Sequence, residues 1–260
     1  ALVLDLDTSM WDVPRLAILT PFQWEFAHVT WFHERFTLRE GLGDAPLHAD
    51  IDALYDSSVV PHADRWDLEA FDLDTILDWD NRVRARQLEA IQSGDRRFLD
   101  LVRLAVFHED MHAEAFAMMR QALAYPAPSL PFPLDGPGEK ISAADGPALD
   151  GDVDFESARM LVGSERGGSF DNERGGVQIM IPAYSIARRC VSELEFLAFV
   201  EDDGYGRREF WSDQGWTWLK AERVVAPATW SREAGAWFVR EFQQKRALEP
   251  ELPVMHVSRH

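Results

Sequence analysis

The sequence predicts an α+β protein of two domains. Residues 1–125 place apolar side chains at helical spacing, and residues 151–260 hold short β-prone runs between glycine turns. Between them, residues 126–150 are rich in proline and glycine and show no periodicity. The total of 260 residues suits two domains. We therefore expect a helical domain, an extended linker and a strand-containing domain, in that order.

Four segments of the first domain are expected to be helical: 1–6 as the end of a helix, 21–35, 75–92 and 98–124. Pro21 favours a helix start at the second of these segments. Asp95 is expected to cap the fourth helix, which Pro126 prevents from continuing.

The second domain is expected to contain a helix at 192–200 and strands at 177–181, 216–219, 236–239 and 254–257. These runs are short and separated by turn residues, which is typical of a sheet with tight connections.

Composition excludes several classes of protein. The net charge of −19 would repel the phosphates of nucleic acid, so no nucleic-acid partner is expected. No apolar run approaches the ~20 residues that a membrane helix needs, so no membrane partner is expected either. The single cysteine, Cys190, excludes an internal disulfide and is typical of the reducing cytoplasm, where we expect the protein to work.

Two histidines in the fourth helix point to chemistry. His108 and His112 are four residues apart, so their imidazoles project from one face of a helix. Two imidazoles on one face make up most of a site for a first-row transition metal. The same pair could instead consist of hydrogen-bonded core histidines without a metal.

The string from His108 to His112 also matches the H-E-x-x-H signature of zinc proteases, in which Glu109 would activate water. That class needs a third ligand downstream. The residues that follow, Ala113–Met119, contain neither the expected glycine nor a histidine. The protease hypothesis therefore has the pair but no good third ligand.

A third histidine strengthens the metal hypothesis. Trp24, His28 and Trp31 share one stripe of the helix at 21–35, so His28 is expected to face inward. His33 is about 140° further around the helix and is expected at the surface or a boundary, not at the metal. Three imidazoles from two helices would cover one side of a metal and leave its other positions open, as a catalytic metal requires.

Several strings resemble the sulfoxide synthases of ergothioneine biosynthesis. WEFAHVTWFHERF resembles their W-x-x-G-H-x-x-W-F-x-E segment, and FHEDMHAEAF resembles their H-E-x-x-H-x-E helix. Further matches, in the same order as in that family, are FDNE at 170–173, IARRCVS at 186–192, EFLAFV at 195–200, GWTW at 215–218 and PVMHVS at 253–258. The resemblance spans nearly the whole chain.

The resemblance implies a DinB-like four-helix bundle followed by a formylglycine-generating-enzyme-like (C-type-lectin-like) domain. It implies that His28, His108 and His112 bind a non-haem Fe(II). It also implies dioxygen-dependent joining of sulfur to the imidazole carbon of hercynine, which leaves a sulfoxide. The related selenoneine synthases use a selenosugar in place of the thiol donor.

Two departures from the family favour the selenoneine branch. Met111 stands where the ergothioneine enzymes typically carry a glutamine near the substrate, and it cannot donate a hydrogen bond. The loop that should bind the carboxylates of γ-glutamylcysteine offers one arginine, Arg65. We expect Met111 and Arg65 to contact substrate, and a selenosugar donor to need fewer cations than a dicarboxylate thiol.

The resemblance places the family's catalytic tyrosine beyond His260, so the catalytic residue is unknown, the second domain is expected to be incomplete, and both ends of the natural protein are expected to be missing. Two other functions stay open. One is a DinB-like, zinc-dependent thiol transferase or hydrolase that uses the same three histidines. The other is a non-enzymatic module that binds a sugar or another ligand.

Overall fold

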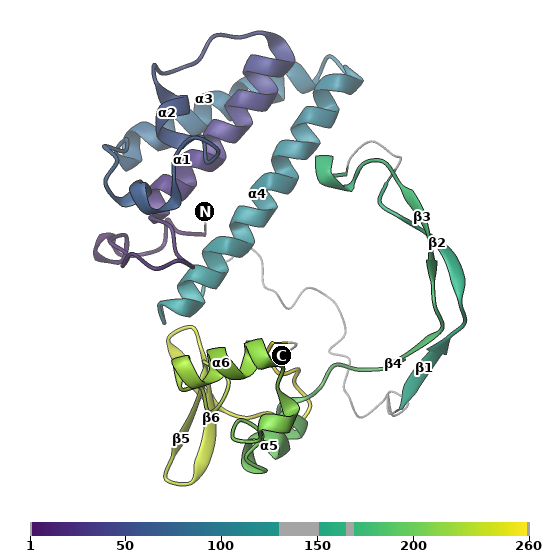
Figure 1. Ribbon diagram of the computed structural model, residues 1–260. Coiled ribbons are helices and arrows are strands. Elements are labelled where there is room, and N and C mark those ends of the chain that lie inside the picture. Colours follow the sequence, from purple (N-terminus) through teal and green to yellow (C-terminus); the bar gives the residue numbers. More distant parts are fainter. Residues whose placement is uncertain (1, 130–150, 165–168, 259–260) are drawn as a thin grey trace. The chain divides into compact units, whose positions relative to one another are not determined.

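The structure is a computed structural model that describes residues 2–129, 151–164 and 169–258, and it confirms the α+β class (Figure 1). The described residues fall into two compact units. One contains the helices of residues 2–122 together with Arg159–Ile179, and the other contains strand β1 (Asp152–Phe155) and residues 180–258. The boundaries expected at residues 125 and 150 stay predictions, because most of the expected linker (130–150) lies outside the described residues.

Three long helices carry the first unit, and all three lie where the sequence predicts them: α1 (Phe22–His33), α3 (Leu73–Ile91) and α4 (Arg96–Ala122). Asp72 caps α3 by accepting a hydrogen bond from the Thr75 amide at 2.8 Å. Asp95 caps α4 in the same way, accepting from the Phe98 amide at 2.8 Å, which confirms the predicted cap.

Helix α1 continues without a break into a π-helix, η2 (Glu34–Leu42). Gly43 ends this segment with a left-handed φ of 78°, and its amide donates to the carbonyl oxygen of Arg39 at 3.1 Å. The shorter helical pieces of the first unit are η1 (Thr8–Met10), α2 (Ile51–Tyr55) and η3 (His62–Trp66). Of these, α2 matters most here because it packs against α1.

The predicted helix at residues 1–6 is wrong, since residues 2–5 form turns. Val3 and Leu6 are buried there, and the Leu6 amide donates to the carbonyl oxygen of Val3 at 3.2 Å. Arg120 of α4 holds this segment by donating to the carboxylate of Asp5 at 2.7 Å. A run with this small number of apolar residues is compatible with a packed turn as well as with a helix.

The core of the first unit surrounds α1, which contacts α2, α3, α4 and η2 (Figure 1). Its fully buried side chains include Phe22, Trp24, Ile76 and Trp79. Each such side chain stabilises the fold by about 1.5–3 kcal/mol through its removal from water. Among the described residues, no helix combines the length and the apolar character that crossing a bilayer requires.

The strands of the described residues form three small sheets. Strand β1 pairs antiparallel with β4 (Tyr184–Ala187), and β2 (Ala158–Val162) pairs with β3 (Val177–Ile181). The third sheet is an antiparallel meander of β5 (Trp230–Glu233), β6 (Ala236–Glu241) and β7 (Gln244–Ala247). Ala234 and Gly235 join β5 to β6 with φ of 48° and 86°, which is the two-residue turn that suits the twist of a hairpin. Strands β3 and β6 confirm the predicted strands at 177–181 and 236–239.

The remaining helices are α5 (Glu193–Glu201) and α6 (Asp213–Glu222), with short turns η4 (Asp171–Glu173) and η5 (Arg208–Phe210). Helix α5 confirms the prediction at 192–200. The predicted strand at 216–219 is wrong, because these residues lie inside α6, whose cap Ser212 accepts from the Gly215 amide at 3.0 Å. The predicted strand at 254–257 is also wrong, because these residues form no strand. The Val254 amide donates to the Val191 carbonyl oxygen at 3.0 Å, but no ladder of hydrogen bonds continues from it in the described residues.

Candidate metal centre

His28 lies in the middle of α1 and is buried, with 3 % of its surface exposed. Its ring stacks between Trp24 and Trp31, with centroid separations of 5.1 and 5.6 Å. Its Nδ1 lies 2.7 Å from the carbonyl oxygen of Tyr55, at the end of α2. Because a carbonyl oxygen only accepts, Nδ1 carries the proton and Nε2 keeps its lone pair.

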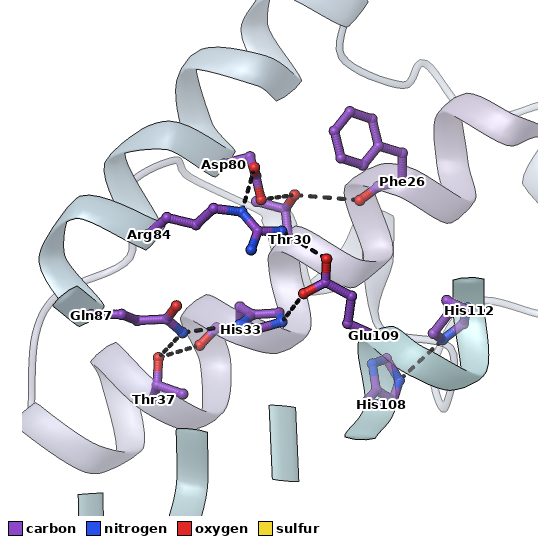
Figure 2. Close-up of polar contacts among 10 residues, drawn as sticks. All are labelled: Phe26, Thr30, His33, Thr37, Asp80, Arg84, Gln87, His108, Glu109 and His112. Atoms are coloured by element: carbon purple, nitrogen blue, oxygen red, sulfur yellow. Dashed lines mark hydrogen bonds and ion pairs between the residues drawn. The ribbon is translucent and has the colours of Figure 1, made fainter. Parts of the chain in front are cut away.

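His108 and His112 lie one turn apart on α4, as their spacing predicts. Their Nε2 atoms are 3.1 Å apart (Figure 2). His112 Nδ1 lies 2.5 Å from Oε1 of Glu25, a buried carboxylate on α1. Because the carboxylate accepts, Nδ1 of His112 carries a proton, and in the neutral ring Nε2 keeps its lone pair.

The three histidines converge. One ring nitrogen from each of His28, His108 and His112 lies within 4.8 Å of the other two. Burial lowers the pKa of His28 to about 4 and the pKa of His108 to about 2, with His112 nearby adding to both effects. Both rings are therefore neutral at physiological pH, as metal ligands must be.

The donor set fits a divalent transition metal. Two ligand atoms about 2.1 Å from one ion are about 3 Å apart when the angle between them is near 90°, which matches the spacing of the two Nε2 atoms on α4. His112 backed by Glu25 is the carboxylate–histidine arrangement that orients metal ligands in many proteins. Three neutral imidazoles suit iron, zinc and nickel alike.

Known proteins resemble this chain. No protein-family model matches it. It is 28 % identical over 250 residues to a hercynine oxygenase of Mycolicibacterium thermoresistibile, an alignment covering 93 % of this chain and 53 % of that protein. It is 27 % identical to the hercynine oxygenases of Mycolicibacterium smegmatis and Mycobacterium tuberculosis, over 93 % of this chain and 56 % of each. The chain is homologous to proteins named hercynine oxygenase. It spans about half the length of these curated relatives.

The two residues predicted to contact substrate lie in different surroundings. The guanidinium carbon of Arg65 is 4.0 Å from the ring centroid of Trp24, which itself stacks on His28. Arg65 thus contacts a ring that itself contacts one of the three histidines. Met111 lies on α4 between the two histidines of that helix and is exposed. A substrate contact for either residue stays a prediction.

The prediction that His33 lies at the surface or a boundary is wrong, because its side chain is buried. Its Nε2 lies 3.1 Å from Oε2 of Glu109, and its Nδ1 lies 3.0 Å from Nε2 of Gln87 (Figure 2). The prediction failed because α1 is enclosed by α2, α3 and α4, so it has no free face of the kind that an amphipathic surface helix has. His33 lies outside the group of three histidines, as expected.

Two groups of the site were missed in the sequence. Glu25 is an acidic residue in a helix that is otherwise aromatic and apolar around His28, and that contrast was the available signal. The carbonyl of Tyr55 had no signal, because any residue type supplies a carbonyl. Its place follows from α2 ending against α1.

Proposed function

We propose that this chain carries the metal-binding part of an enzyme that uses dioxygen to join a chalcogen to the imidazole of hercynine. The observation that carries the proposal is the convergence of His28, His108 and His112 in a chain homologous to hercynine oxygenases. The name of those relatives supports hercynine and dioxygen as substrates.

In this proposal the three Nε2 atoms hold Fe(II), which supplies one-electron chemistry with dioxygen when it is bound. The protein holds two of the three ligands by hydrogen bonds to the ring nitrogen that faces away from the metal position. The Tyr55 carbonyl fixes the ring of His28, and Glu25 fixes the ring of His112. Trp24 and Trp31 cover both faces of the His28 ring and keep water from it.

The proposed reaction balances with one dioxygen. Hercynine loses the hydrogen of an imidazole carbon, the donor loses its S–H or Se–H hydrogen, and a new C–S or C–Se bond forms. One oxygen atom enters the product as the sulfoxide or selenoxide, and the other leaves as water. We favour a selenosugar as the donor, because Met111 cannot donate a hydrogen bond and Arg65 is the one predicted cation of the donor loop.

The test is reconstitution of the full-length protein with Fe(II) without oxygen, followed by hercynine, dioxygen and one donor. Mass spectrometry should find a product that joins hercynine to the donor and contains one added oxygen. The His108→Ala variant should bind no stoichiometric metal and give no product. Thiol transfer or hydrolysis with zinc and without dioxygen would favour the zinc enzyme instead. Hercynine binding without turnover would favour a binding module.

A further inference from the structure

A chain of polar contacts crosses the first unit and reaches α4 at Glu109 (Figure 2). Arg84 of α3 donates from Nη2 to Oε1 of Glu109 at 3.0 Å and from Nε to Asp80 at 2.7 Å. His33 of α1 approaches the other carboxylate oxygen, Oε2, at 3.1 Å. Glu109 therefore uses its two oxygens on two different helices.

The direction of the hydrogen bonds can be followed through the chain. Gln87 donates from Nε2 to His33 Nδ1 and, at 2.8 Å, to Thr37 Oγ1. Thr37 in turn donates to the carbonyl oxygen of His33 at 2.6 Å. His33 Nδ1 is thus an acceptor, so the proton of the neutral ring is on Nε2, the atom that lies 3.1 Å from Oε2 of Glu109. These contacts therefore form with a neutral His33 ring.

Glu109 is bonded directly to His108 in the sequence, so the two move together. His28 belongs to α1, whereas His108 and His112 belong to α4, and the rotation of α4 about its axis sets the distances between them. A ring nitrogen about 6 Å from a helix axis moves by about 1 Å when the helix rotates by about 10°. Metal–ligand distances vary by only about 0.2 Å.

We propose that Glu109 is a positioning residue for the metal site. By binding Arg84 of α3 and His33 of α1, it fixes the rotation of α4, so that His108 and His112 meet His28 at a distance at which one ion can be held. This role rests on the proposed metal site. It differs from the general-base role that a zinc protease would give to the same residue.

The contacts favour a positioning role over a mainly stabilising one. The side chains of Arg84 and Glu109 are 40 % and 37 % exposed, so their ion pair contributes only modestly to stability. Variants of either residue should therefore fold. His33 is 3 % exposed and fixed by Gln87, so it gives Glu109 a rigid partner.

The experiment measures Co(II) affinity by competition with a chromophoric chelator, together with the visible spectrum of the bound Co(II). Glu109→Gln should weaken binding about tenfold, the lower end of what the loss of an outer partner of a ligand costs. The band positions or intensities should change as well. Arg84→Met should weaken binding too, although it removes a positive charge near the site. Simple attraction between charges would predict the opposite sign for that variant.

Two controls separate positioning from charge and from stability. Asp110→Asn removes an exposed negative charge from the next position of α4 and should leave affinity within about twofold. Asp5→Asn breaks the ion pair between Asp5 and Arg120 of α4, away from the histidines. This variant should lower stability without changing the Co(II) spectrum. Wild-type affinity and spectrum in both Glu109→Gln and Arg84→Met would overturn the proposal, and so would tighter binding in Arg84→Met. A wild-type protein that fails to bind Co(II), or a His108→Ala variant that binds equally well, would instead overturn the metal site itself.

Discussion

The helices of residues 2–122 and the strand pairs of residues 152–187 differ in how far they bury their apolar side chains. Ile76, Trp79 and Val83 of α3 are 0 % exposed. In strands β2 and β3, by contrast, Val162 is 53 % exposed and Val177 is 60 % exposed, and no described residue covers them. The three histidines lie among the helices of residues 2–122, which we call the closed region. The geometry of the candidate metal centre can therefore be argued from the helices alone, because every group that orients it belongs to them.

Removing one large side chain from each region tests this contrast most strongly. Trp79→Ala leaves a cavity and removes the hydrogen bond from Trp79 Nε1 to the buried Glu34 carboxylate, which keeps only the Leu47 amide among the described residues, so it should lower the free energy of unfolding by about 3–5 kcal/mol. Phe155 of β1 is 46 % exposed, and Phe155→Ala should cost less than about 1 kcal/mol. Urea unfolding followed by helical circular dichroism measures both. Equal losses would show that the two regions are packed alike.

Acid should lower the stability of the closed region through His28. The ordinary pKa of His28 is 6.5, and burial lowers it to about 4 in the fold, so the unfolded chain binds more protons between these pH values. The stability that neutral His28 contributes is complete above about pH 6.5 and is lost as the pH falls towards 4. At about 1.4 kcal/mol for each pKa unit, the metal-free protein should lose about 3 kcal/mol over that range. His108 acts with the same sign.

Urea unfolding of the metal-free protein at pH 7.5, 5.5 and 4.5 measures this loss. The His28→Gln variant is the control, and its stability should depend less on pH over the same range. A wild-type stability that stays constant from pH 7.5 to 4.5 would contradict the burial of a neutral ring at this position.

Within the closed region, the carboxylate behind His112 should matter for metal affinity. Glu25→Gln removes the charged acceptor of His112 Nδ1 but keeps the size of the side chain. Metal affinity should fall by 10- to 100-fold, as for other outer partners of ligands, with little change in helix content. Chelator competition measures the affinity. An unchanged affinity would mean that packing alone, and not this contact, orients the ring.

The smallest expected effect concerns the donor. Arg65 is the predicted cation of the donor loop, and a donor with two carboxylates would lack a second counter-charge there. We expect kcat/KM to be at least roughly tenfold higher with a 1-selenosugar than with γ-glutamylcysteine, equivalent to about 1.4 kcal/mol in the barrier. Competition between the two donors in the full-length protein measures the ratio. Equal use, or a preference for γ-glutamylcysteine, would place the donor site in the sulfur class.

The sequence predicted the long helices and the meeting of the three histidines because helical periodicity states which residues share a face. It did not predict the surroundings of that face. His33 was expected at the surface or a boundary, yet it is buried because α3 and α4 both place side chains against it. Residues 216–219 were expected as a strand because a short apolar run has no measurable period, and the Ser212 cap of α6 was overlooked. A tertiary contact decided the first case, and a local cap decided the second.

The hydrogen bond from His28 Nδ1 to the Tyr55 carbonyl has a consequence for how an ion enters the site. The ring is already neutral at physiological pH, and its one proton is on the nitrogen that faces away from the ligand position. Uptake of an ion therefore displaces no proton from His28. The heat that this ligand contributes to binding is then the same in every buffer, whatever the ionisation enthalpy of that buffer.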